Sequence, residues 1–247
     1  MGVIAVLATL TLVSVRAITD NARLSSATNT IMAALANARA LAMKKNTIVL
    51  VVFRPRIEGN NKQVVEVVTA KWTGESFIDA DDKVVDRFVP IPDVPVRSIP
   101  VGIKIAAPRY GPNEDDLWIT QAHLPAIDQQ TGSGEAPGKL IAIMYGPDGT
   151  TITRNSQSDS RRLFVDFNND RIQQGGPVPD FNQTFEDDEP FLAMAPFIAV
   201  FDDDEAREMF DTTAWEDVDI RRADLTEYIT QFADRIHFNR YTGVAMK

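Results

Sequence analysis

The chain has 247 residues, a net charge of −10 and 44 % apolar residues. A chain this apolar can form a buried core, and its negative charge argues against broad binding to nucleic acid or anionic membranes, which needs a positive surface. It has no cysteine and only two histidines, which excludes disulfides and thiolate sites and nearly excludes an imidazole-rich zinc site.

The chain begins with a short apolar stretch. Residues 2–15 carry no charge, and Arg16 ends the run. The run is shorter than the roughly 20 residues that a membrane-spanning helix needs. It is compatible with a signal peptide, a buried core helix, or a membrane helix whose beginning precedes this sequence. No basic residue precedes the run and Val15-Arg16-Ala17 is a poor cleavage site, which disfavours the signal peptide.

A helical stripe follows the apolar stretch. Leu24, Thr28, Ile31, Leu35, Ala38 and Ala42 recur at alternating spacings of four and three residues. Because residues 3–53 contain no proline or glycine, one helix can extend from the apolar stretch to about Lys45. We expect its first half to lie in lipid or among identical helices, and its second half to pack on a head domain. The residues predicted for the membrane and filament core are Val3, Ile4, Val6, Leu7, Leu10, Leu12 and Val13, and those predicted to pack on the head are Leu24, Ile31, Leu35, Ala38 and Ala42.

The sequence after the helix is rich in strand-forming residues. Residues 47–53 and 63–72, separated by Glu58-Gly59-Asn60-Asn61, predict a β-hairpin. Six prolines between residues 79 and 112 predict edge strands and loops rather than central strands. Further strands are predicted at 140–145, 150–154 and 163–167, with a turn at 146–149 between the first two.

The last third of the chain is strongly acidic. Residues 180–227 hold sixteen acidic and three basic residues. We interpret the region of about 170–225 as an acidic insertion in the head. A short helix is predicted at 223–236, with Asp224 as its N-cap and Glu227 three residues later, close to a capping box.

Three segments resemble type IV pilin-like proteins, most closely the H-type minor pseudopilin of type II secretion and its pilus relatives. They are the helix-to-strand junction 38–53, the turn Tyr145-Gly146-Pro147-Asp148-Gly149-Thr150, and the C-terminal segment 235–245 with its Thr242-Gly243 pair. The family carries a glutamate near its processed N-terminus, whereas this chain has no acidic residue before Asp20. Either an upstream segment supplies the missing motif or this subunit lacks the glutamate, and the short apolar run favours the first alternative.

The resemblance implies an α+β fold in which a long N-terminal α-helix packs on an antiparallel β-sheet head. Residues 1–46 would form the membrane and filament-core helix, and residues 47–247 an extracytoplasmic β-rich head. The implied protein is a structural subunit of a type IV pilus or a type II secretion pseudopilus, and not an enzyme. It would be anchored in the inner membrane first and would then join an extracytoplasmic or cell-surface filament of identical or other pilin-like subunits, with no nucleic-acid partner.

Two other classes of protein remain as alternatives. The first is a membrane-tethered extracytoplasmic binding protein or adhesin that does not polymerise. The second is a tethered hydrolase in which His123 acts with a nearby acid and Ser133, Ser156 or Ser158. The sequence lacks the glycine-x-serine-x-glycine motif of a nucleophile elbow, so a catalytic role for His123 is not expected.

One segment has the spacing of a cation site. Asp166, Asn168 and Asp170 place oxygen atoms at alternate positions, as the start of an EF-hand-like calcium loop does. Arg171 occupies the position of the required glycine, and Pro177 that of the bidentate glutamate. We therefore interpret the segment as an Asn/Asp turn and expect no cofactor, with calcium as the alternative.

Two other charged groups are interpreted as solvated surface. The acidic runs 186–189 and 202–205 could bind divalent cations or a basic partner, but a solvated acidic face explains them more simply. Some pilus relatives of the family bind DNA through a basic C-terminal region, but alternating charges on the exposed face of a last strand explain the small basic cluster here equally well. Its members are Arg235, His237, Arg240 and Lys247.

Overall fold

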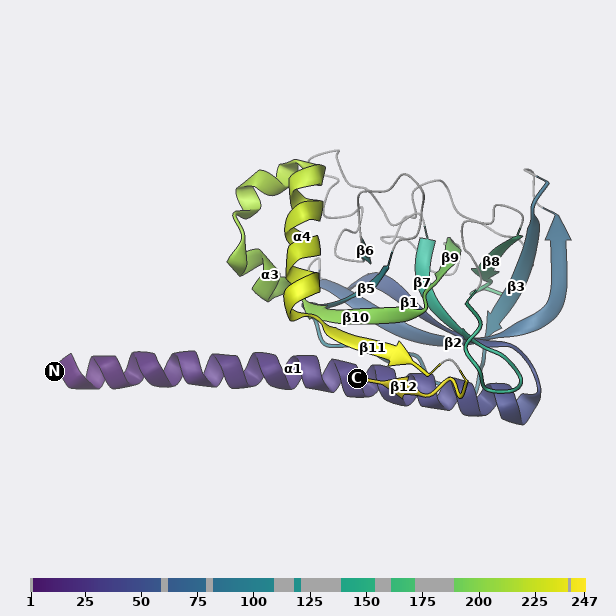
Figure 1. The fold of residues 1–247 in the computed structure, drawn as a ribbon, viewed down its shortest axis with the longest axis horizontal. Helices are drawn as coiled ribbons and strands as arrows, with labels where there is room; N and C mark the ends of the chain where they lie inside the picture. The colour runs from purple at the N-terminus through teal and green to yellow at the C-terminus, as the bar shows by residue number, and fades with distance from the viewer. Residues whose placement is uncertain are drawn as a thin grey trace.

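The computed structural model describes residues 2–58, 62–78, 82–108, 118–120, 139–153, 161–171, 189–239 and 241–247 (Figure 1). Helix α1 (Gly2–Lys45) lies along one side of a β-rich head, and its N-terminal part projects beyond the head. Side chains of α1 are described from Thr19 onward. The helix ends with Lys44 and Lys45, at the place where the sequence changes from helical spacing to a strand.

The larger sheet of the head has seven strands. Its order is β8-β3-β2-β1-β7-β9, with β4 beside β2. The bounds of these strands are β1 Val49–Glu58, β2 Lys62–Ile78, β3 Val84–Pro90, β4 Arg97–Ser98, β7 Lys139–Tyr145, β8 Arg161–Val165 and β9 Phe191–Met194. β1 pairs antiparallel with β2 and β7, whereas β8 runs parallel to β3 and β9 runs parallel to β7. The outer strands β8 and β9 contact each other, so the sheet nearly closes into a barrel.

A second, five-stranded sheet has the order β12-β11-β10-β5-β6. Its strands are β5 Ile103–Pro108, β6 Trp118–Thr120, β10 Phe197–Asp202, β11 Asp234–Phe238 and β12 Ala245–Met246. Three short helical segments follow β10, namely α3 (Asp203–Met209), the 3₁₀ helix η1 (Thr212–Glu216) and α4 (Val218–Phe232). They pack on the face of β5 and β10 that points away from α1, around Phe201, Tyr228 and Ile229.

The predicted fold class is therefore wrong. The chain is mostly β, with a mixed, nearly closed sheet and a second sheet, instead of a long helix on a small antiparallel sheet. A parallel pair cannot be joined by a tight turn, because the chain must cross over before it runs in the same direction again. β8 and β9 reach their parallel neighbours from distant parts of the sequence, so local turn signals could not identify those pairings.

Strand β1 shows how the layers meet. Val49, Val51 and Phe53 belong to the core cluster shared with α1, and Leu50 and Val52 belong to the core inside the barrel-like sheet. Successive side chains of a strand point to opposite faces, so both faces of β1 are buried. This explains why the strand is apolar at every position from 49 to 53 instead of alternating with polar residues.

The structure confirms some predicted elements. The hairpin β1–β2 pairs Val49 with Lys71 and continues to Glu58 opposite Lys62, so both strands are longer than predicted. The predicted strand at 140–145 is β7, and the predicted strand at 163–167 is β8, displaced by two residues. The C-terminal strand pair is β11 with β12.

Other predicted elements differ. The prolines predicted edge strands, but β3 and β5 each have a neighbouring strand on both sides. Pro90 and Pro108 lie at the last positions of these strands, where the missing backbone N–H donor costs little. The predicted strand 150–154 is a single bridge between Tyr145 and Thr151 in its described part. The predicted helix at 223–236 begins earlier, at Val218, because Asp217 caps it.

Candidate functional site

The described part of α1 has one face buried against the head. Ile31, Leu35, Ala38 and Ala42 are fully buried in the core cluster that includes β1 and β7, and Leu24 packs partly buried at its edge. Burial of a large side chain such as Ile31 or Leu35 stabilises the docked helix by roughly 1.5–3 kcal/mol. The alanines let the helix approach the sheet closely.

Two arginines also fix α1 to the head. The guanidinium of Arg23 donates to Asp204 at 3.0 Å and to the carbonyl oxygen of Val101. Gly102, with φ +86°, makes room for this contact, because a Cβ there would lie 2.2 Å from Arg23. Nearer the end of the helix, Arg39 Nε donates to the carbonyl oxygen of Thr242 at 2.7 Å. The helix is thus held at both ends of the head.

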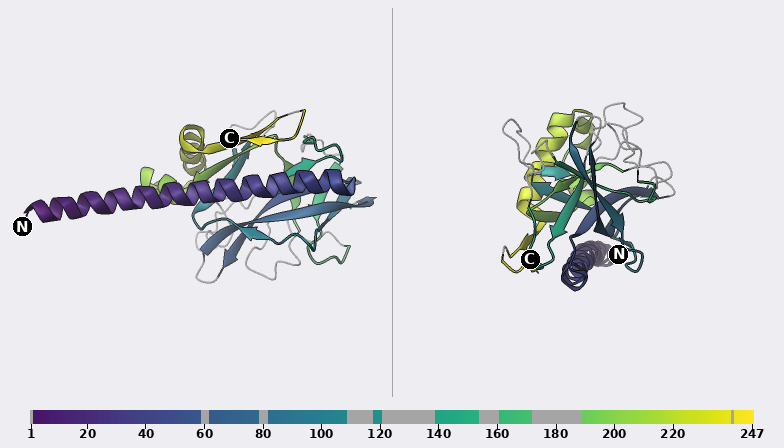
Figure 2. Two further views of the ribbon diagram at one scale, coloured as in Figure 1. Left: turned by 90° about the horizontal axis from the view of Figure 1, so that it is seen from below. Right: turned by 90° about the vertical axis from the view of Figure 1, so that its right-hand side faces the viewer.

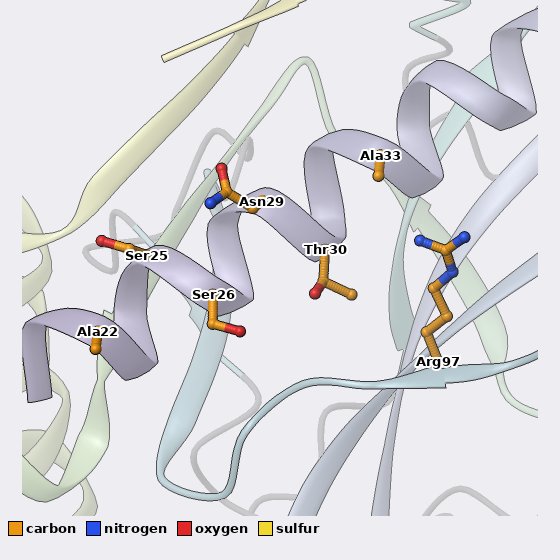
Figure 3. Close-up of a pocket in the computed structure, with 7 residues that line it drawn as sticks. All are labelled: Ala22, Ser25, Ser26, Asn29, Thr30, Ala33 and Arg97. Atoms are coloured by element: carbon orange, nitrogen blue, oxygen red, sulfur yellow. The ribbon is translucent and has the colours of Figure 1, made fainter. Parts of the chain in front are cut away.

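Another face of α1 is open. Ala22, Ser25, Ser26, Asn29, Thr30 and Ala33 recur at spacings that put them on one side of the helix, and they line a groove of about 580 Å³ with Arg97 of β4 (Figure 3). The guanidinium of Arg97 extends toward the helix across this groove. The helical residues are small or short, and most are exposed. A second helix could therefore approach α1 closely here, because small side chains keep little distance between backbones.

The predicted membrane and filament-core residues belong to the part of α1 without described side chains. The structure does not describe the side chains of these seven residues, which are Val3, Ile4, Val6, Leu7, Leu10, Leu12 and Val13. In the part of the chain that the structure describes, no helix has the length and apolar character needed to cross a membrane.

The predicted cation segment forms a compact turn after β8. Carboxylate oxygens of Asp166, Asp170 and Glu189 lie within 4.8 Å of one another. Asn168 hydrogen-bonds to Asp170 within this turn. Its amide donates to Asp170 at 3.1 Å, and its own oxygen accepts from the Asp170 backbone N–H at 2.9 Å.

The carboxylates of this group are already engaged. Arg87 Nε donates to the buried Asp166 at 2.6 Å, and the backbone N–H groups of Asp170 and Arg171 donate to the same carboxylate. Glu189, fully buried, accepts from the backbone N–H of Phe167 at 2.8 Å. The donors are of the hard oxygen type that calcium prefers. However, the Arg87 guanidinium already supplies positive charge to Asp166, which favours a structural turn over a cation site.

A buried lysine lies on the second sheet. Lys104 is buried on the face of β5 that points toward α3 and α4, because its neighbours Ile103 and Ile105 point into the α1 core. Burial lowers the pKa of Lys104 to about 8, opposed by attraction to Asp203 and reinforced by repulsion from Arg207. Asp203 in turn accepts from Arg207 Nε at 2.9 Å. Burial of the Lys104 ammonium therefore carries a desolvation cost, which the nearby carboxylates of Asp203 and Asp204 reduce.

The acidic run 202–205 has a structural role. Asp202 caps α3, with its side chain accepting from the N–H groups of Asp204 and Glu205. Burial raises the pKa of Asp202, although these hydrogen bonds and Arg23 oppose the rise. Tyr228 donates to Glu205 at 2.7 Å, which joins α4 to α3.

The remaining candidates are dispersed or outside the described residues. His123, Ser133, Ser156, Ser158 and Arg240 lie outside them, as does the acidic run 186–189 apart from Glu189. The other C-terminal basic residues have local partners. Arg235 donates to the carbonyl oxygen of Thr230, His237 stacks on Phe197, and Lys247 pairs with Asp234 at 2.6 Å.

Sequence reasoning missed two charged residues of these clusters, namely Arg87 and Lys104, and it named Glu189 only within the acidic run 186–189. Lys104 had a signal, since a lysine within the apolar run 103–107 must either reach the surface or be buried with partners. Arg87 had none, and nothing in the sequence placed Glu189 at this turn, because these residues meet Asp166 and Phe167 across 79 and 22 residues of sequence.

Comparison of the chain with protein-family models, with curated proteins and with solved structures finds no match.

Proposed function

We propose that this chain is a structural subunit of a filament, of the type IV pilus or type II secretion pseudopilus class, that assembles through α1. The observation that carries the proposal is the asymmetry of this helix. One face is buried in the head, another lines an open groove, and the N-terminal part projects beyond the head (Figures 1 and 2). A helix that only stabilised the head would need the buried face, but neither the open groove nor the projecting N-terminal part.

The projecting part explains the need for a partner. Residues 2–15 are uncharged and mostly apolar, and apolar surface exposed to water is unfavourable. Lipid could cover this segment in a single subunit, and the α1 helices of other copies could cover it in a filament. The proposed course is therefore anchoring in the inner membrane, followed by transfer of the helix into the core of an extracytoplasmic filament.

The groove supplies a place where helices could meet. Ser25, Ser26 and Ala33 are exposed and short, so a neighbouring helix would lose little side-chain freedom and could pack close to the α1 backbone. Among the described residues that line the groove, Arg97 at its far side alone carries a charge. An apolar helix could therefore enter without burying several charges.

The test uses purified full-length chain transferred from detergent into buffer and into lipid vesicles. Filaments are measured by sedimentation and electron microscopy. Leu10→Asp should abolish filaments, because an unpaired ion among packed helices costs several kcal/mol. Leu10→Met is the matched control and should assemble normally. Near-ultraviolet circular dichroism verifies that the head remains folded in both variants.

Filament formation by Leu10→Asp at the normal yield would refute assembly through this segment. Wild-type chain that stays monomeric and lipid-bound would favour the tethered binding protein or adhesin instead. A second pair of variants tests the groove. Ala33→Trp should fill it and block assembly, whereas Ala33→Ser leaves it open and should assemble like the wild type.

A further inference from the structure

One end of the head carries a concentrated negative charge. Residues 203–227, in α3, η1 and α4, include ten acidic and three basic residues. This region lies at the end of the head from which α1 projects (Figure 1). It also exposes apolar side chains, since Met209 is 49 % and Ile220 is 44 % exposed. We call the exposed residues of this end the acidic cap; they include Glu208, Met209, Asp211, Asp219, Ile220 and Glu227.

The opposite end of the head carries exposed cations. Lys44 and Lys45, in the last turn of α1, are exposed, and among the described residues neither forms an ion pair. Met43 is 41 % exposed and Tyr241 is 85 % exposed. We call Met43, Lys44, Lys45 and Tyr241 the basic end. The helix dipole favours cations at a helix C-terminus and would explain why lysines occur there. It gives no reason for the exposed tyrosine and methionine.

A nearby carboxylate does not neutralise the basic end. Gly149 lies against Met43, which brings Asp148 to the same end of the head. Asp148 accepts hydrogen bonds from the backbone N–H and the hydroxyl of Thr150, at 3.0 and 2.8 Å. These hydrogen bonds hold Asp148 in its own turn, and among the described residues it forms no ion pair with Lys44 or Lys45, so both lysines remain available to a partner.

We propose that the basic end of one subunit binds the acidic cap of a second copy. This contact rests on the proposed filament function and names the partner of each head. Two copies of a chain with net charge −10 repel each other except where opposite charges face each other. The cap and the C-terminal end of α1 lie at opposite ends of the head along the helix axis (Figure 1). Contact between two different surfaces repeats without closing when the subunits are translated along an axis, which produces a filament.

The chain is suited to a direct test because it contains no cysteine. Full-length chain carrying Met43→Cys is mixed with full-length chain carrying Met209→Cys and assembled under mild oxidation. Both changes keep every charge. The proposed contact gives disulfides between the two variants. The matched control pairs Met43→Cys with Ser98→Cys, an exposed residue of β4 outside both surfaces, and should give no disulfide.

Charge reversal tests the electrostatic origin of the contact. Lys44→Glu combined with Lys45→Glu should lower the yield of cross-linked chain about tenfold, and high salt should lower the wild-type yield, because exposed ion pairs are screened. Glu208→Lys with Asp219→Lys in the partner chain should restore the yield of the reversed variant. A loss without restoration would mean that charge pairing does not form the contact.

The outcomes separate this contact from the filament function. Filaments that form through α1 but cross-link only between identical variants would overturn the head-to-tail contact and leave the filament function standing. Cross-linking between Met43→Cys and Met209→Cys chains in the absence of filaments would support the contact and contradict the filament function. Filaments with no cross-link in any pairing would also overturn the contact.

Discussion

The burial of Lys104 predicts an unusual dependence of stability on pH. Its pKa is lowered to about 8 in the folded protein, mainly by burial, whereas an unfolded lysine titrates near 10.5. Below pH 8 both states are protonated, and the folded state bears the whole cost of the buried charge. Between these two pKa values the folded state has lost the proton and the unfolded state still binds it. The free energy of unfolding should therefore rise with pH in this window.

The size of the effect follows from the two pKa values. The full difference corresponds to about 3 kcal/mol, and the part gained between pH 7 and pH 9.5 is about 2 kcal/mol. Above pH 10 the two buried tyrosines Tyr145 and Tyr228, whose pKa values are raised by burial, reverse the trend. They stay protonated in the folded state while the unfolded chain ionises, so stability falls. The measurement therefore belongs below pH 10.

The assay is urea unfolding of the full-length chain in a mild detergent, followed by tryptophan fluorescence, since Trp215 is buried beside α4. Lys104→Met is the control, because it keeps the length of the side chain and removes the charge. It should show no rise between pH 7 and pH 9.5. A rise of the same size in Lys104→Met, or a decline in the wild type over this window, would refute the assignment to Lys104.

Three further predictions follow from the site. Arg87→Met should lower the free energy of unfolding by about 3–5 kcal/mol, because it leaves Asp166 buried without its ion partner; a loss below about 1 kcal/mol in urea unfolding would contradict this. Gly102→Ala should cost about 1–3 kcal/mol and more than Gly74→Ala, because both glycines have φ +86° but only an added Cβ at Gly102 meets other side chains. Calcium and magnesium at matched ionic strength should shift the melting temperature slightly and equally, because Arg87 already pairs with Asp166, and Asp166 and Glu189 already accept backbone N–H hydrogen bonds. A calcium-specific rise of many degrees, lost in Asp170→Ala, would instead identify a calcium site.

Elements defined by neighbouring residues were predictable. The helical spacing from Leu24 to Ala42 and the absence of proline and glycine predicted α1, and the apolar runs around Glu58-Gly59-Asn60-Asn61 predicted the hairpin. The alternating oxygens of Asp166, Asn168 and Asp170 likewise predicted an Asn/Asp turn, in which Asp166 and Asn168 accept from backbone N–H groups. In each case the determining contacts lie within a few residues of one another, so spacing and turn chemistry suffice.

The prediction of an antiparallel head was wrong, because hairpin signals identify only those paired strands that follow one another in the sequence. Nothing near residues 161–165 indicates that they pair with 84–88. The helix at 218–232 has Asp217 as its N-cap, and in the sequence Asp224 is an equally good candidate for that position. Asp224 has the residue type of an N-cap, yet it accepts a hydrogen bond from Trp215 at 2.8 Å. Tertiary contact therefore decided which of the two aspartates, Asp217 or Asp224, caps the helix.

By itself the sequence determined that α1 is helical to about Lys45, that a hairpin follows it and how charge is distributed, since these depend on backbone preference and residue type over short spans. Only the tertiary structure decided that the sheet is mixed and nearly closed, that Arg87 and Glu189 reach the turn at Asp166, and that Lys104 is buried. These features arise from residues far apart in the chain. Their free energies depend on which groups lose water together and which charges then lie close enough to compensate one another.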